Sequence, residues 1–326
     1  MRLRKRRGAY RRAACASLVA KTKIAIVGLG KIARDQHLPS LKSSEAFELI
    51  AVASPHSTLD GVPSFADIET LLQAVPDVSA VAVCTTPQVR YEIARYALEH
   101  GLHVLLEKPP GATISEVCAL VDLAERKRAT LFASWHSRHA RAVEPARAWL
   151  AGRRISSVAI AWKEDVRFWH PNQPWIWEAG GLGVFDPGIN ALSILTRIIP
   201  STVVLKSAEL CYPSNCDTPI AASLRLTDSR SASVGVEFDF RQTGRQIWDI
   251  DVETDAGRLS LSMGGSTMTV NNEPVDTAPN TEYASLYAHF ARLVQRRHID
   301  VDIAPLQLVA DAFLCGRRVE VEPFLE

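Results

Sequence analysis

The stretch KIAIVGLGKIA, residues 23–33, decides the fold of the first half of this chain. It passes from an apolar run typical of a buried strand, through the turn GLG, into residues typical of a helix start. Gly28 permits the tight turn, Gly30 lets a pyrophosphate approach the backbone, and the small Ala33 lets the helix pack closely on the strand. A helix N-terminus also attracts phosphates. The stretch therefore predicts a dinucleotide-binding turn, in which Lys31 and Ile32 join the two glycines.

Outward from this turn, short apolar runs alternate with longer helical stretches. The runs at residues 48–54, 80–85, 103–107 and 131–136 are typical of buried parallel strands. Residues 89–101 and 114–128 have the pattern of helices between them. This alternation predicts an α/β fold, with a Rossmann-type doubly wound parallel sheet over residues 22–140.

The rhythm changes in the second half. Strand-like runs follow one another with few helices between them, at residues 158–168, 203–212, 221–228, 231–240 and 248–263. They predict a mostly antiparallel open sheet in a second α/β domain, residues 141–326. Two helices close the chain, at residues 281–297 and 305–318. The last one is placed so that it can pack back on the Rossmann domain.

Length and charge exclude several classes of protein. The 326 residues suffice for two domains of ~150 residues each, and no apolar run reaches the length of a membrane span. Residues 1–20 carry seven basic side chains and no acidic one; removing them from the net charge of +1 leaves −6 for residues 21–326. Such a body repels nucleic acid. Residues 1–21 are expected to be a disordered leader, with a targeting signal as the alternative, and the protein is expected to be cytoplasmic.

Polar residues follow three of the predicted strands, where a doubly wound sheet binds its ligands. After the second strand stand Ser54 and His56, and no carboxylate occupies the place of the acid that usually holds the adenosine ribose. The sequence therefore does not encode a strict preference for NAD, and NADP is an equal candidate. The other residues expected at the cofactor are Thr85, Thr86, Pro87, Glu107 and Lys108.

Two motifs suggest chemistry beyond the cofactor. Lys108 precedes two prolines at the end of the fourth strand, and a cis bond to Pro109 is expected there. Asp186 precedes Pro187, so the Asp is expected to be the N-cap of a helix. At four-residue spacing, Asp186 and Asn190 can also face one cleft. The six cysteines are scattered without a CxxC pair, so neither a metal site nor a disulfide framework is expected.

These motifs together resemble the glucose–fructose oxidoreductase/inositol dehydrogenase/MocA family, over residues 22–326. The resemblance rests on the Gly-rich turn, the Glu107-Lys108-Pro109 tripeptide and the pattern from Gly180 to Asn190. Longer runs, among them KIARDQHLPS (31–40), WKEDVRFWHP (162–171) and WIWEAGGLGVFDPGINALSI (175–194), are similar to bacterial aldose 1-dehydrogenases acting on D-galactose and L-arabinose. The resemblance implies a nicotinamide cofactor and the oxidation of a sugar at C1, a reaction without a metal.

One position departs from the broad family. Many members have a histidine base where this chain has Asn190, and an amide cannot accept a proton. The base is therefore expected elsewhere, at Lys108 or Asp186, while Asn190 holds a sugar hydroxyl, as in the galactose/arabinose branch. The residues expected at the sugar are His136 and Glu164, with Glu164 and Asp165 on opposite faces of a strand. Trp169 and Trp248 are candidate platforms for the sugar ring, against core packing as the alternative.

The sequence thus predicts an NAD(P)-dependent aldose 1-dehydrogenase for D-galactose and L-arabinose. The alternatives are another polyol or aldose dehydrogenase of the same family, such as an inositol or glucose dehydrogenase, and a non-catalytic NAD(P)-binding sensor. The expected partner is a small aldose, with neither nucleic acid nor membrane. A homodimer through the open sheet is also expected.

Overall fold

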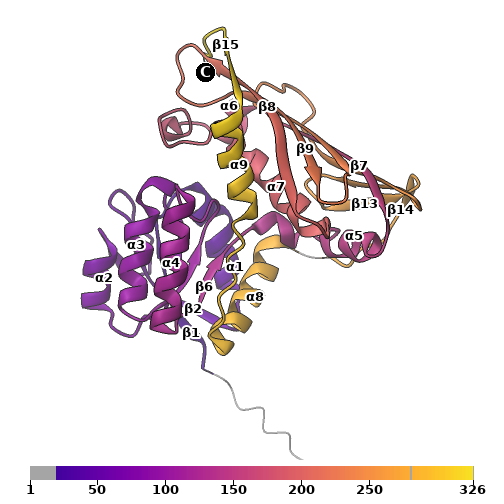
Figure 1. Ribbon diagram of the computed structural model, residues 1–326. Coiled ribbons are helices and arrows are strands. Elements are labelled where there is room, and N and C mark those ends of the chain that lie inside the picture. The colour runs from indigo at the N-terminus through magenta and orange to yellow at the C-terminus, as the bar shows by residue number, and fades with distance from the viewer. Residues whose placement is uncertain (1–19, 280, 326) are drawn as a thin grey trace, which may run out of the picture.

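A computed structural model describes residues 20–279 and 281–325. The predicted leader therefore lies almost entirely outside the described residues. The chain forms two bodies (Figure 1): an α/β Rossmann domain built from the first part of the chain, and a sheet domain above it. No helix in the described ranges is long and apolar enough to cross a membrane.

The Rossmann domain contains one parallel sheet with the strand order β3-β2-β1-β4-β5-β6. This order is the one found in dinucleotide-binding doubly wound sheets. Its strands are almost entirely apolar because helices cover both faces. The predicted parallel sheet is confirmed, with the short β3 added. The strands are β1 (Thr22–Val27), β2 (Phe47–Ala53), β3 (Ser64–Phe65), β4 (Ala80–Val83), β5 (His103–Leu106) and β6 (Leu131–Ala133).

The helices of this domain begin where local capping permits. α4 (Ile114–Lys127) starts with a capping box, in which Thr113 and Glu116 each bind the other's backbone N–H. α3 (Pro87–Glu99) starts with a proline in its first turn. The helix after the Gly-rich turn is a short π-helical segment, η1 (Ala33–His37), that continues into α1 (Leu38–Lys42). A further helix, α2 (Ile68–Ala74), precedes β4.

The sheet domain contains a nine-stranded sheet in the order β14-β13-β12-β11-β7-β10-β9-β8-β15. Only the pairs β7–β10 and β8–β15 are parallel, so the predicted mostly antiparallel sheet is confirmed. The strands are β7 (Ile155–Lys163), β8 (Val203–Pro213), β9 (Ala221–Asp228), β10 (Ser233–Asp239), β11 (Ile247–Thr254), β12 (Gly257–Ser262), β13 (Thr267–Val270), β14 (Glu273–Pro274) and β15 (Arg317–Val321).

One face of this sheet packs against helices. α5 (Val143–Leu150), α7 (Phe185–Ile198) and α9 (Ala304–Cys315) bury their apolar residues against it in one continuous core. Phe185 of α7 meets Phe238 of β10 edge to face, with ring centroids 5.8 Å apart. The core fixes α7, whose first turn carries Asp186, relative to the end of β7.

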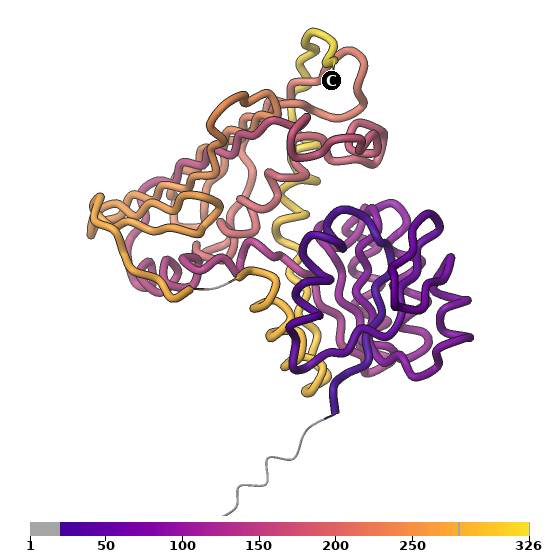
Figure 2. The backbone as a smooth tube through the Cα atoms, turned by 180° about the vertical axis from the view of Figure 1, so that it is seen from behind, coloured from indigo at the N-terminus to yellow at the C-terminus, as the bar shows by residue number. Residues whose placement is uncertain are grey.

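The two closing helices pack on different domains. α8 (Glu282–Arg296), and not the last helix, packs on the Rossmann sheet, where Phe290 stacks on Phe47 with centroids 5.4 Å apart. α9 instead joins the core of the sheet domain, with Phe313 against Phe185. Both views place α8 beside the Rossmann domain and α9 beside the sheet (Figures 1 and 2). The predicted packing of residues 305–318 on the Rossmann domain is therefore wrong, because the apolar side chains of α9 fit the other core and residues 317–321 form β15.

Candidate active site

The Gly-rich turn has the geometry that a dinucleotide requires. Gly28 has φ +93°, and a Cβ there would lie 2.7 Å from the backbone nitrogen of Thr85. A Cβ on Gly30, by contrast, would meet nothing within 4 Å, so the backbone is open to a ligand. The Thr85 hydroxyl is buried at the carboxyl end of β4 without a partner in the described part of the chain. An unpaired buried donor beside an open Gly-rich turn fits a bound dinucleotide.

The turn after β2 presents hydrogen-bond donors and no acid. The side chains of Ser54 and His56 have no hydrogen-bond partner among the described residues. Arg34, in η1, reaches this turn, and its Nη2 donates to the Thr58 carbonyl at 3.3 Å. Residues 54–58 contain no arginine, and the fold brings one to the turn from the neighbouring helix.

Lys108 and Asp186 meet between the two domains. Lys108 follows β5 at the carboxyl end of the Rossmann sheet, and its bond to Pro109 is cis, as predicted. Its Nζ lies 3.0 Å from Asp186 Oδ1 and 3.0 Å from the Asp186 carbonyl oxygen. Both side chains are largely buried, with 14% and 5% exposed. The structure thus brings the two alternative base candidates into direct contact.

Asp186 is not the N-cap that the sequence suggested. The helix begins one residue earlier, at Phe185, with Val184 as its N-cap, so Asp186 lies inside the first turn. Its carboxylate is directed to Lys108 and not to the helix backbone. Burial raises the pKa of Asp186, but the charges of Lys108 and His170 outweigh this and hold the pKa below its ordinary value. Asp186 is therefore an ionised carboxylate, able to accept a proton.

A chain of polar side chains continues from Asp186 into the sheet domain. His170 Nδ1 lies 3.7 Å from Asp186 Oδ2, and His170 Nε2 lies 3.3 Å from Glu164 Oε1. Trp248 Nε1 donates to Glu164 Oε2 at 2.9 Å. The Trp169 ring meets the Trp248 ring edge to face, with centroids 5.3 Å apart. The structure thus brings together Glu164, Trp169 and Trp248, all of them expected, and adds His170.

Two local expectations near this chain are wrong. β7 ends at Lys163, so Glu164 and Asp165 are not strand residues on opposite faces; Asp165 is the N-cap of the short helix α6 (Val166–Trp169). β6 ends at Ala133, so His136 does not close the strand and instead opens the 3-10 helix η2 (His136–His139). In both places a polar residue that binds backbone or side-chain partners ends the strand earlier than its hydrophobic pattern suggests.

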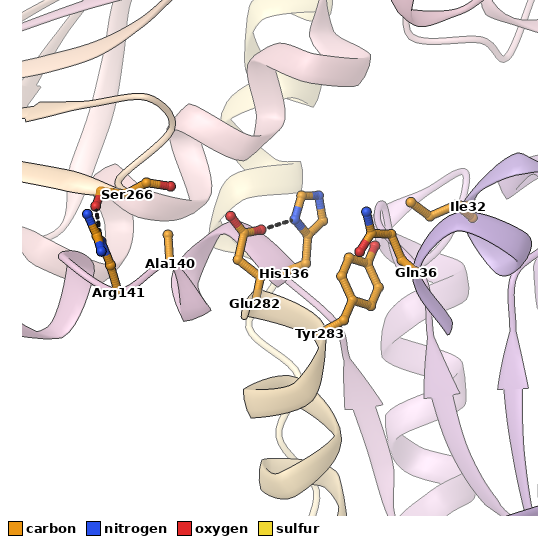
Figure 3. Close-up of a pocket in the computed structure, with 8 residues that line it drawn as sticks. All are labelled: Ile32, Gln36, His136, Ala140, Arg141, Ser266, Glu282 and Tyr283. Carbon is orange, nitrogen blue, oxygen red and sulfur yellow. Dashed lines mark hydrogen bonds and ion pairs between the residues drawn. The ribbon is translucent and has the colours of Figure 1, made fainter. Parts of the chain in front are cut away.

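His136 lines a cavity at the junction of the domains. The cavity has a volume of about 450 Å³, and its walls come from η1, η2, the start of α8 and the loop between β12 and β13. His136 Nδ1 is bound to Glu282 Oε2 at 2.7 Å (Figure 3).

Asn190 lies one turn beyond Asp186 on α7, half-buried, and its side-chain amide has no partner in the described ranges. Its amide is therefore free to bind a ligand.

His170 was missed by sequence reasoning, as was Arg34. His170 stands in the quoted run WKEDVRFWHP, and its signal was a histidine beside Trp169 in a segment already assigned to the sugar. Arg34 carried no signal, because an exposed arginine in a helix is usually solvated. Only the fold shows that it reaches the turn after β2.

Comparison with known proteins agrees with this geometry. Residues 22–134 match the oxidoreductase family with an NAD-binding Rossmann fold. The chain is 44% identical over 304 residues to galactose 1-dehydrogenase from Pseudomonas fluorescens, covering 93% of this chain and 99% of the relative. A solved structure of D-galactose-1-dehydrogenase from Rhizobium etli is 54% identical, with a TM-score of 0.91 over 94% of this chain and 99% of that one.

A more distant solved structure shares the fold alone. It is a 3-ketoreductase from Actinomadura kijaniata, crystallised with NADP, at 18% identity and a TM-score of 0.81 over 93% of this chain and 100% of that one.

The Rossmann domain, its open Gly-rich turn and the Lys108–Asp186 pair define an NAD-binding oxidoreductase. The chain belongs to the glucose–fructose oxidoreductase/inositol dehydrogenase/MocA family.

Proposed function

We propose that this protein is an NAD(P)-dependent aldose 1-dehydrogenase that oxidises D-galactose and L-arabinose to their lactones. The observation that carries the proposal is the buried Lys108–Asp186 pair, continued by His170 and Glu164, at the carboxyl end of the Rossmann sheet. The names of the similar galactose dehydrogenases support the choice of sugar. The alternative of a non-catalytic sensor leaves such a pair of buried charges unexplained.

The proposed chemistry removes a hydride from C1 of the sugar and a proton from the hydroxyl group on C1. When bound, the nicotinamide supplies the hydride acceptor. The proton of the anomeric hydroxyl passes to the Lys108–Asp186 pair as the C1–O bond becomes a carbonyl. Lys108 Nζ contacts the hydroxyl and passes one of its own protons to Asp186 Oδ1, 3.0 Å away, as it accepts the hydroxyl proton, so that the step ends with a protonated carboxyl group and an unchanged ammonium.

The proposed sugar site reads ring hydroxyls through charged and amide groups. Glu164 and His170 lie beyond Asp186, and Asn190 lies one helical turn along α7. His136, which lines the cavity at the junction of the domains, is proposed to bind the sugar as well. Each of these groups can bind a sugar hydroxyl, either as a hydrogen-bond acceptor only or as both donor and acceptor. The rings of Trp169 and Trp248 cover an apolar face of the sugar.

Initial rates test this function. The full chain is assayed with D-galactose and L-arabinose, each with NAD and with NADP, by the absorbance of the reduced nicotinamide. We expect turnover of both sugars. An inositol as the sole substrate indicates the alternative enzyme of the family, and binding of NADPH without turnover of any sugar indicates a sensor.

The homodimer is also a proposal. β9 and β10 alternate buried and half-exposed residues, so one face of the sheet packs on helices while the other carries polar side chains such as Ser223, Arg225 and Glu237. A second copy of the chain pairs with this open face. Light scattering is expected to give the mass of a dimer, and an Arg225→Glu variant on this face to give a smaller one.

A further inference from the structure

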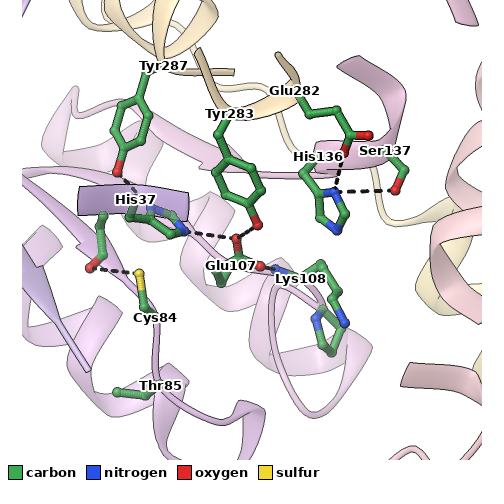
Figure 4. A network of polar contacts seen from close by, with 12 residues as sticks. His37, Cys84, Thr85, Glu107, Lys108, His136, Ser137, Glu282, Tyr283 and Tyr287 are labelled. Carbon is green, nitrogen blue, oxygen red and sulfur yellow. Dashed lines mark hydrogen bonds and ion pairs between the residues drawn. The ribbon is translucent and has the colours of Figure 1, made fainter. Parts of the chain in front are cut away.

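The first turn of α8 touches two parts of the site that belong to a distant stretch of the chain. Glu282 Oε2 lies 2.7 Å from His136 Nδ1, and the Tyr283 hydroxyl donates to Glu107 Oε1 at 2.7 Å (Figure 4). Tyr283 and Glu107 are 176 residues apart in sequence. Neighbouring residues of one helical turn thus hold His136, expected at the sugar, and Glu107, which precedes Lys108.

Glu107 transmits this contact to the backbone of Lys108. Its carboxylate is buried, and Oε2 accepts the Lys108 N–H at 2.7 Å, while Oε1 also binds His37 Nε2 at 3.0 Å. Burial raises the pKa of Glu107, but the hydrogen bond and charge of His37 outweigh this and lower it to about 2. Burial and the nearby Glu107 raise the pKa of Tyr283 well above 10, so its phenol remains a donor. Both carboxylate oxygens are therefore occupied.

The opposite side of the same backbone is held by Arg90. This buried guanidinium donates to the Glu107 carbonyl at 2.6 Å, and also to the carbonyls of Pro109 and Thr85. Burial lowers its pKa to about 10, which leaves it charged at neutral pH. The peptide from Glu107 to Pro109 is thus fixed within the Rossmann domain by Arg90 and fixed to α8 by Tyr283.

We propose that Glu282 and Tyr283 are positioning residues, and that each of them places a different group of the active site. Tyr283 acts through Glu107 on the placement of Lys108, and Glu282 acts through His136 on the placement of the sugar. The proposal rests on the proposed function for the roles of Lys108 and His136. It implies that two adjacent residues affect different kinetic constants: Tyr283 affects kcat, and Glu282 affects the KM for the sugar.

The helix offers a matched control for this idea. The Tyr283 ring packs edge to face on His37 at 5.0 Å and stacks on His136 at 5.4 Å, and phenylalanine keeps both contacts. Tyr283→Phe therefore removes only the hydroxyl. The Tyr287 hydroxyl, one turn later, makes an equally buried contact with His37 Nδ1 at 2.7 Å and does not bind Glu107 itself. Tyr287→Phe is the control for loss of a buried hydrogen bond in α8.

Steady-state kinetics and melting temperatures of the full chain test the proposal. Tyr283→Phe is expected to lower kcat about 10-fold, the effect of one hydrogen bond, with the sugar KM within about twofold. Glu282→Gln is expected to raise the sugar KM about 10-fold with kcat within about twofold. Tyr287→Phe is expected to change both by less than about twofold. Equal effects of Tyr283→Phe and Tyr287→Phe, or joint changes of kcat and KM that follow the melting temperature, overturn the proposal.

A second readout needs no turnover. The rate at which the Lys108 amine is acylated, measured by peptide mass spectrometry, reports its placement and charge. Tyr283→Phe is expected to change this rate about threefold or more, and Tyr287→Phe to leave it unchanged. An unchanged rate in Tyr283→Phe overturns the proposal even if no aldose is a substrate, whereas absence of turnover with a changed rate overturns only the proposed function.

Discussion

At the residue scale, the account depends on one buried ion pair. Lys108 and Asp186 come from different domains and are 78 residues apart, yet their side chains meet at 3.0 Å. The sequence predicted both residues and their roles as candidate proton acceptors. It misplaced Asp186 as a helix cap because a proline follows it, and the structure directs the carboxylate to Lys108 instead.

Removing the lysine tests its role. Lys108→Ala is expected to lower kcat by ~10² or more, the usual contribution of a positioned acid–base group, with the fold retained. Asp186→Asn is expected to be comparably damaging; since Asp186 caps no helix, no loss of a cap adds to its effect. Lys163→Ala, at the end of β7, is the control and is expected to leave kcat within about twofold. Circular dichroism checks folding, and near-normal turnover of folded Lys108→Ala removes this residue from the mechanism.

The choice of cofactor also belongs to single residues. Ser54 and His56 lie on the turn after β2, and the guanidinium of Arg34 reaches this turn from η1, so we expect the 2′-phosphate of NADP to meet donors and no acid there. Ser54→Asp is expected to weaken NADP about 10-fold by repulsion, and Arg34→Gln to weaken it less, because an exposed charge is screened by salt. NAD affinity is expected to stay within about twofold in Arg34→Gln. Titration of NADPH and NADH fluorescence measures both, and an unmodified protein that does not bind NADPH contradicts this reading of the turn.

At the scale of elements, hydrophobic pattern predicted the strands of both sheets, and local chemistry decided where they end. β6 and β7 stop before His136 and Glu164 because these polar side chains bind partners outside the ladder. His170 lies just after the four-residue helix α6; its position beside Trp169 was a weak signal, and only its tertiary contacts with Asp186 and Glu164 give it a role. β14 has too few residues to show a period, and the start of β15 was included in the helix predicted over residues 305–318.

The lowered pKa of Glu107, just after β5, makes the free energy of unfolding depend on pH. Glu107 has a pKa of about 2 in the folded chain against an ordinary value of 4.5, so its pairing with His37 stabilises the fold above about pH 4.5. This contribution is lost as pH falls towards 2, and in full it corresponds to about 3 kcal/mol. Urea unfolding at a series of acidic pH values measures it. Glu107→Gln is expected to show a shallower acid loss than the parent; an equal loss in both contradicts the assignment.

At the scale of the whole molecule, the site exists only where the two domains meet. The Rossmann domain provides the Gly-rich turn and Lys108, the sheet domain provides Asp186, His170, Glu164 and Asn190, and α8 returns to hold both. The sequence predicted the two kinds of sheet and named most of the residues of the candidate site, because each motif has a local signature. It did not predict which closing helix returns to the first domain, since α8 and α9 are both apolar on one side and only the shapes of the two cores distinguish them.

The measurement that tests the central claim most directly is the ratio of kcat/KM for D-galactose to that for D-glucose. The two sugars differ only at C4, so a site that binds the ring hydroxyls through Glu164, His170 and Asn190 leaves a buried group unpaired with glucose. That loss is ~1–3 kcal/mol, or about 5- to 150-fold in kcat/KM. We predict galactose to be preferred by this margin, with L-arabinose and D-fucose, which share the ring stereochemistry, also accepted. Equal or better kcat/KM on glucose contradicts the account.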